Sequence, residues 1–410
     1  MNKPISQEEL ISQQDVFMKE ITTAQTADDV KTIVNALNAG WRNEVASQLG
    51  MDKKTFQAAQ GVLGLQTSDS SGLFRMADAV PSKSTTQYYT PSSASHFSST
   101  YNNLLHALKP SSSGGLKVAL GPMYAKWVIY RSADTSDKTQ LELFTFWANR
   151  NLDPGKAAAA ITTFKAAASD PLNLAYDAYV DKANLTTFVD DASDSYTLPS
   201  YSCTISQAHS AVLVGGPANI AFDSTTMDTS SDGTTVKGSA SGMFDIFSAG
   251  ASGSYDSLDK MAASSGFKIT GTISNYGTLA VTRGGWYTSG ELTRAYTGKN
   301  DDNIWDPLAN QGNWDSFFGP DGSMPRRVSQ LLLVSGYDIT VTSEASYSAS
   351  QYKKITTDAS VGIWPFFSVN VSTTHTTKFS QGANGELIVR YKQNDGQIAI
   401  WGATITDLPG

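Results

Sequence analysis

The sequence predicts an α+β fold, in which a helical N-terminal half precedes an internally duplicated antiparallel β-sandwich or flattened barrel. Apolar residues recur at helical spacing in the first half of the chain. After about residue 195, short runs rich in Val, Ile, Thr, Phe and Tyr alternate with Gly, Asn and Asp, which is typical of strands and turns. Motifs of this second half also occur twice, in the same order.

The N-terminal part indicates a small helical domain over residues 1–64. Thr26 and Asp29 match a capping box, and apolar residues then follow at helical spacing as far as Trp41. Gly40 is a natural helix stop, a second helix would end at Gly50, and a third is expected over residues 52–61.

The next two segments differ in composition. Residues 65–117 are rich in Ser, Gly, Thr and Pro, so we expect a linker or lid around one short helix near residues 101–108. Residues 118–195 indicate a helical region that packs on the β domain, with helices over 140–149, 155–168 and 172–180. Two of these begin at Asp-Pro pairs, Asp153-Pro154 and Asp170-Pro171, and proline is tolerated in the first turn of a helix.

The β domain is expected over residues 196–410, with copies at about 210–283 and 330–403. Residues 213–222 (LVGGPANIAF) have a counterpart in residues 333–341 (LVSGYDITV), about 120 positions later. Apolar runs also flank Asn275-Tyr-Gly277 in the first copy and Asn394-Asp-Gly396 in the second. Because Asn-Asp-Gly favours the positive φ of tight turns, these positions predict two hairpins. Neither copy can cover its own apolar face, so we expect the two to pack against each other.

The insertion between the copies, residues 284–329, gathers aromatic residues among Gly, Asn and Asp. Aromatic rings cover the apolar face of a sugar while Asp and Asn bond its hydroxyls, so this loop is a candidate glycan site. Packing of the loop against the sheet edges is the alternative. The ligand-binding candidates are Trp286, Tyr287, Trp305 and Trp314.

Two segments of the β domain, 236–255 and 359–373, alternate between apolar and small or polar residues. Such alternation is typical of a transmembrane β-hairpin, in which roughly 9 to 11 residues per strand cross the bilayer. A soluble sandwich shows the same pattern, and Pro365 and Asp245 argue against insertion. The membrane-insertion candidates are Val236, Phe244, Ile246, Phe247, Tyr255, Ile363, Phe367, Val369 and Val371.

The motifs FSAGASGSY, WPFFSVNVSTTH and AIWGATI resemble those of an uncharacterised group of bacterial and fungal β-rich proteins. The resemblance is limited to the C-terminal half of the chain. It implies a β-rich fold and transfers no activity.

Composition argues against several function classes. With 30 Lys and Arg against 38 Asp and Glu, the net charge is −8, whereas a nucleic-acid partner requires a basic surface. One cysteine, Cys203, argues against disulfides within the chain and multi-cysteine metal sites. The four histidines are scattered, and no hydrolase elbow, phosphate loop or dinucleotide fingerprint occurs in its required setting. A Cys203–His209 nucleophile and base pair is the weaker alternative to a buried structural thiol.

We therefore expect no enzyme, catalytic residue, cofactor or metal. The predicted function is that of a membrane-active, pore-forming-toxin-like effector that oligomerises on a target membrane, with residues 224–256 as the inserted hairpin. The alternative is a soluble self-assembling structural or glycan-binding protein. A hydrolase is a third and weaker hypothesis. Expected partners are a membrane lipid or glycan and further copies of the chain. The polar N-terminus predicts synthesis in the cytoplasm without a Sec signal, and release by lysis or a dedicated secretion system.

Overall fold

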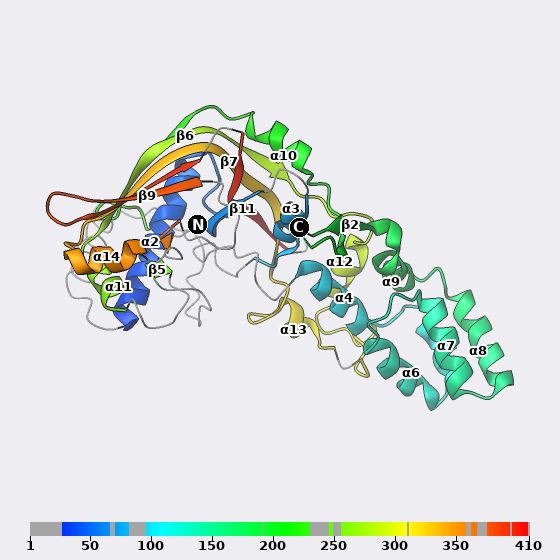
Figure 1. Ribbon diagram of the computed structural model, residues 1–410. Helices are drawn as coiled ribbons and strands as arrows, with labels where there is room; N and C mark the ends of the chain where they lie inside the picture. The colour runs from blue at the N-terminus through cyan, green and yellow to red at the C-terminus, as the bar shows by residue number, and fades with distance from the viewer. Residues whose placement is uncertain are drawn as a thin grey trace.

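The computed structural model describes residues 27–65, 70–81, 96–190, 192–229, 246–248, 256–309, 311–357, 362–366, 375–393 and 396–408. Within them the chain is a mixed α+β protein with a mostly antiparallel sheet, so this part of the expected fold class is confirmed. A strongly curved sheet arches over three helices at one end of the molecule, and a helical arm extends from the other end (Figure 1). The expected cap at Thr26 lies outside the described residues.

The main sheet has seven strands within the described residues. They are β1 (Phe56–Gly64), β4 (Ala218–Asp223), β6 (Phe267–Ala280), β7 (Arg326–Ser343), β9 (His375–Gln381), β10 (Leu387–Gln393) and β11 (Ile398–Asp407). Two small sheets pair β2 (Leu185–Val189) with β3 (Ser195–Pro199) and β5 (Phe247–Ser248) with β8 (Gly362–Ile363).

Strand β7 organises the sheet. One of its edges pairs with β6 from Gln330 to Ser343, and β4 pairs with the outer edge of β6. The other edge of β7 pairs with β11 along its first half and with β10 along its second half. Strand β1 then pairs with β11 and β9 with β10, and every one of these pairings is antiparallel. The two expected copies therefore lie side by side in one sheet, and the expected face-to-face packing is wrong.

Both expected hairpins are also wrong. Asn275, Tyr276 and Gly277 lie within β6 and pair with Ser335, Val334 and Leu333 of β7. Strands β10 and β11 do not pair with each other in the described register but follow one another along β7. At the point where the partner of β7 changes from β10 to β11, Gly396 adopts a φ of 85° and Gly336 of β7 adopts a φ of 68°. The long strand β7 thus offers hydrogen-bond partners to the residues on both sides of each predicted turn. This pairing outweighs the local preference for a turn.

The described α-helices are α2 (Ala27–Gln48), α3 (Ser71–Asp78), α4 (Phe97–Ala107), α5 (Ser113–Leu120), α6 (Met123–Ser132), α7 (Gln140–Asn151), α8 (Pro154–Ala166), α9 (Pro171–Val180), α10 (Ile205–Val212), α11 (Asp256–Ala263), α12 (Ser289–Thr297), α13 (Trp314–Phe318) and α14 (Ala349–Thr357). A short 3-10 helix covers Lys182–Asn184. Helices α7, α8 and α9 confirm the three expected over 140–180. None of the described helices combines the length and apolarity needed to cross a bilayer.

The expectation of a small helical domain over residues 1–64 is wrong for the described part. Helix α2 continues through Gly40, where a Cβ would lie 2.6 Å from the sulfur of Met227, so the small residue permits close packing. Residues 56–64, which include part of the expected third helix, form β1 on the edge of β11. Phe56 is fully buried, and this tertiary pairing overrides the helical preference of the Ala and Gln residues.

Two other expected loops contain helices. In residues 65–117, α4 lies close to the one short helix expected there, and α3 is an additional helix. Their Leu73, Phe97, Tyr101 and Leu104 are fully buried, so the described part of this segment is not a linker. The insertion 284–329 contains α12 and α13.

Three apolar cores support these elements. The first joins the inner face of the sheet to α2, α11 and α14. The second lies on the opposite face, over the half of the sheet near β1, where α3 and α10 contact the strands and α4, α9 and α12 pack against one another in the same core. Residues 331–334 of β7 are consequently buried on both faces, whereas residues 337–343 alternate between buried and half-buried. The third core belongs to the helical arm, α5 to α8.

Candidate functional site

Two connections leave the sheet at the same end. Strand β4 ends at Asp223, which pairs with Lys268 near the start of β6. Strand β7 ends at Ser343, which pairs with Phe267 on one side and with Leu387 on the other. The connection from β4 to β6 covers residues 224–266, and that from β7 to β10 covers residues 344–386, so each is 43 residues long.

The described parts of these connections pair with each other. Strand β5 of the first runs antiparallel to β8 of the second, with Phe247 opposite Ile363. The backbone N–H of Trp364 donates to the carbonyl of Ile246 at 2.8 Å. We call residues 246–248 and 362–366 the clasp. Helix α11 supports it, because the Asp259 carboxylate accepts the N–H groups of Ile246 at 3.1 Å and Phe247 at 2.9 Å.

The clasp is held against α2 and the sheet. The indole Nε1 of Trp364 donates to Oδ1 of Asn38 at 2.7 Å, and its ring meets Trp41 edge-on at 6.5 Å. The N–H of Ile363 donates to the hydroxyl of Tyr391 on β10 at 3.4 Å. Burial raises the pKa of the Tyr391 phenol well above its usual value, so the hydroxyl stays protonated.

Three of the predicted membrane-insertion residues meet in this clasp. Ile246, Phe247 and Ile363 are each at most 1% exposed, and the structure brings them together from the two connections. The other six candidates, Val236, Phe244, Tyr255, Phe367, Val369 and Val371, lie outside the described residues. Sequence reasoning missed Asn38 and Asp259, because a lone polar residue in a helix carries no signal of its distant partner.

The predicted glycan-binding aromatics mostly pack inward. Trp286 is fully buried with its Nε1 donating to the carbonyl of Ser200 at 2.7 Å, and Trp305 is 8% exposed with its Nε1 donating to Gly298 at 2.8 Å. Neither offers a ring face to a sugar, so this expectation is wrong for both. Tyr287 and Trp314 are half-buried, and the Lys299 ammonium lies 4.0 Å from the ring of Trp314. The expectation failed because α12 and α13 fold onto the second core.

Other groups considered for chemistry are structural. Burial raises the pKa of the Cys203 thiol to about 12, so it is not a thiolate at neutral pH. The buried Asp78 carboxylate accepts the N–H and hydroxyl of Ser98 and the hydroxyl of Tyr201, which ties α3 to α4, and desolvation raises its pKa. Among the described residues, no three His, Cys, Asp or Glu side chains group as a metal site would require.

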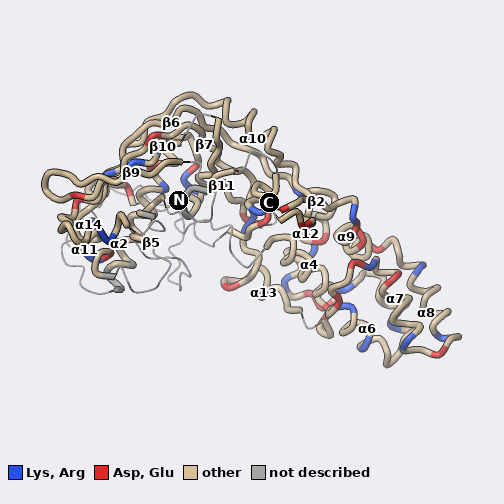
Figure 2. The backbone as a smooth tube through the Cα atoms, in the orientation of Figure 1, with Lys and Arg blue, Asp and Glu red and all other residues tan. Residues whose placement is uncertain are grey.

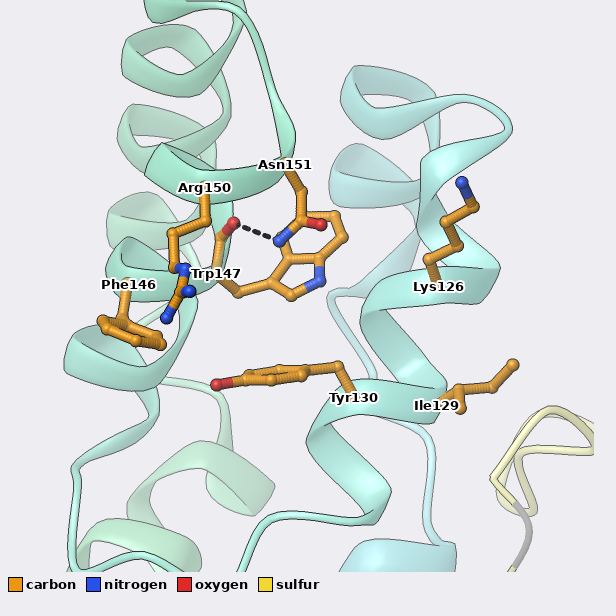
Figure 3. A pocket seen from close by; sticks show the side chains of 7 residues that line it. All are labelled: Lys126, Ile129, Tyr130, Phe146, Trp147, Arg150 and Asn151. Carbon is orange, nitrogen blue, oxygen red and sulfur yellow. Dashed lines mark hydrogen bonds between the residues drawn. The ribbon is translucent and has the colours of Figure 1, made fainter.

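A second candidate site, which sequence reasoning missed, lies on the helical arm (Figure 3). An open groove of about 560 Å³ runs between α6 and α7. Its lining residues are Lys126, Ile129, Tyr130, Phe146, Trp147, Arg150 and Asn151. We call it the arm groove.

Comparison of the chain with protein-family models, curated proteins and solved structures finds no match.

Proposed function

We propose that the protein is a membrane-active, pore-forming effector, in which residues 224–266 and 344–386 convert into β-hairpins that insert into a target bilayer. The observation that carries the proposal is that both connections leave the same end of one sheet, from neighbouring antiparallel strands, and have the same length. Connections of equal length that leave neighbouring strands at the same end of the sheet would form hairpins that reach the same depth in the bilayer.

Strand geometry is compatible with such an extension. A connection of 43 residues, folded back once, supplies about 20 residues per strand, or roughly 65 Å at about 3.3 Å per residue. This exceeds the roughly 9 to 11 residues that cross a bilayer as a tilted strand. The register of β4, β6, β7 and β10 would continue into four inserted strands per copy. Open edges are not tolerated in lipid, so several copies must close a ring, which accounts for the proposed oligomer.

An internal duplication, as expected from the repeated motifs, would fit the same scheme. We assign the repeats 210–283 and 330–403 to the strand pairs β4–β6 and β7–β10, each joined by one of the two connections. Strand β9 belongs to the second connection and would have to leave β10. It is an edge strand whose residues are mostly exposed, so its release uncovers little apolar surface.

The clasp is the restraint in this scheme. It holds the apolar residues Ile246, Phe247 and Ile363 away from water before membrane contact, and α2 from the N-terminal half covers them. Helix α2 would thereby help to keep the connections folded. Opening the clasp would expose these side chains, which a bilayer can then accept.

A disulfide across the clasp tests the proposal. Ser248 and Gly362 are direct partners in the β5–β8 ladder, so the double variant Ser248→Cys, Gly362→Cys can be oxidised in a Cys203→Ala background. The oxidised protein should release no dye from vesicles of phosphatidylcholine and phosphatidylserine, and a reductant should restore release.

The matched control is Thr187→Cys, Thr197→Cys in the same background, because these residues are direct partners in the β2–β3 hairpin outside both connections. Its oxidised form should release dye like the reduced form. Equal leakage from the oxidised clasp variant, or no leakage by the reduced protein, would overturn the proposal.

A further inference from the structure

The arm groove exposes apolar side chains that the fold does not use. Ile129 is 53% exposed, Tyr130 36% and Phe146 43%, whereas Trp147 at the back of the groove is 3% exposed and belongs to the core of the arm. In Figure 3, Tyr130 projects from α6 toward the groove, and Phe146 and Arg150 lie across it on α7. Exposed aromatic and aliphatic residues gathered in one open groove are typical of a binding surface.

The groove is also cationic. The Arg150 guanidinium lies 5.0 Å from the ring centre of Phe146, and the Lys138 ammonium lies 5.9 Å from the same ring. Lys126 flanks the groove from α6. None of the seven lining residues is acidic, and no ion pair within the described residues involves Lys126 or Arg150. Both charges are therefore available to an anion.

The surrounding arm has the opposite charge to the rest of the molecule. Residues 113–166 contain seven Lys and Arg and four Asp and Glu. Because the buried Arg131 pairs with Asp306, this leaves an excess of two positive charges on the arm, in a chain whose total is −8 (Figure 2). Such a separation orients a molecule toward a negative surface, and each basic residue near an anionic bilayer contributes about 1 kcal/mol of binding free energy.

We propose that the arm groove binds the anionic headgroup of a membrane phospholipid and so attaches the protein to its target. This rests on the proposed function for the identity of the surface. The Arg150 guanidinium and the Lys126 ammonium would pair with the headgroup phosphate or carboxylate. Tyr130, Phe146 and Ile129 would enter the interfacial layer, where aromatic side chains are favoured. A soluble anion would leave these three side chains exposed to water, which favours a lipid as the occupant.

The test measures co-sedimentation of the full-length protein with phosphatidylcholine vesicles, with and without phosphatidylserine. The double variant Lys126→Gln, Arg150→Gln should bind the anionic vesicles about 25-fold more weakly, because each of the two charges in the groove contributes roughly a fivefold factor. The variant Tyr130→Gln, Phe146→Gln should weaken binding while keeping the charge.

The matched control is Lys117→Gln, Lys165→Gln, which removes the same charge from exposed positions on the same arm, outside the groove. This variant should retain most of the wild-type affinity. An equal loss in the control would mean that the whole arm attracts the membrane without a groove site. Loss of heparin binding with unchanged vesicle binding would assign the groove to a polysaccharide. Either result would overturn the proposal.

The failure of this inference can be distinguished from that of the proposed function. The oxidised clasp variant should bind anionic vesicles like the wild type and release no dye. Groove-dependent binding without any leakage by the wild type would overturn pore formation and leave the groove proposal standing. Leakage that the clasp disulfide blocks but that groove variants do not alter would overturn the groove proposal and leave pore formation standing.

Discussion

The side-chain oxygen of Asn38 accepts a hydrogen bond of 2.7 Å from the indole of Trp364, 326 positions further along the chain. Both side chains are buried, Asn38 on α2 and Trp364 in the clasp. The bond therefore joins helix α2 to the second of the two connections. A substitution at Asn38 can thus weaken the attachment of the clasp without changing any strand residue.

Removal of this bond should loosen the clasp. In Asn38→Ala the indole N–H of Trp364 loses its partner, and an unsatisfied buried donor costs about 1–3 kcal/mol. We expect a lower Tm and faster dye release from vesicles. Trp305→Phe is the control, because it removes another buried indole bond, to Gly298, outside the clasp. That variant should lower the Tm without faster release; equal acceleration in both would show that general instability is responsible.

Gly277 should be intolerant of a side chain although it is not in a turn. A Cβ at this position of β6 would lie 1.9 Å from the carbonyl oxygen of Ala211, a backbone atom that cannot move aside easily. Gly277→Ala should lower the free energy of unfolding by about 1–3 kcal/mol, measured in urea. Gly290→Ala in α12, where no atom lies within 4 Å, should be neutral or slightly stabilising. Equal effects of the two substitutions would contradict the close approach of β6 and α10.

The buried His106 should make the protein less stable in acid. Burial lowers the pKa of its imidazole to about 4, and Nδ1 donates to the carbonyl of Asn102 at 2.8 Å. An unfolded histidine has a pKa near 6.5, so between pH 6.5 and 4 the unfolded state binds more protons and stability falls as the pH decreases. At pH 5 this loss amounts to about 2 kcal/mol.

His106→Gln should therefore reduce the difference between urea unfolding free energies measured at pH 7 and pH 5. Val118→Gln, at an exposed position of α5 without a titratable group, serves as the control and should leave the difference nearly unchanged. An unaltered pH dependence in His106→Gln would show that other groups cause the acid sensitivity.

The single cysteine should be inert in the native protein. Cys203 is fully buried, and burial raises its pKa to about 12, so almost no thiolate is present at pH 8. A disulfide reagent should label it only after denaturation, as followed by absorbance. Rapid labelling of the native protein would place the thiol in a region that opens readily, and Cys203→Ala would then be needed in every labelling experiment.

Local signals alone were enough to predict α7, α8 and α9. The Asp153-Pro154 and Asp170-Pro171 pairs begin α8 and α9, and the Asp170 carboxylate accepts the N–H of Leu172 as a helix cap. In α7 the Thr139 hydroxyl and the Glu142 carboxylate form a capping box. These interactions span two to four residues, so the sequence contains all of their partners within one turn.

Alternation also identified part of the candidate site. It selected Ile246, Phe247 and Ile363, which meet in the clasp, but could not show that they meet, because their pairing joins positions more than one hundred residues apart. Nor could it select the arm groove, since the exposure of Tyr130 and Phe146 depends on how α6 packs against α7.

The sequence by itself determined the mixed α+β class and the capped helices of residues 140–180. Only the tertiary structure decided that residues 56–64 form β1, that β6 continues through Asn275-Tyr-Gly277, and that β10 and β11 share one edge of β7. The physical reason is that strand pairing supplies hydrogen-bond partners from distant parts of the chain. Those partners override local preferences for a helix or a turn, because a buried backbone group must be paired wherever its partner lies.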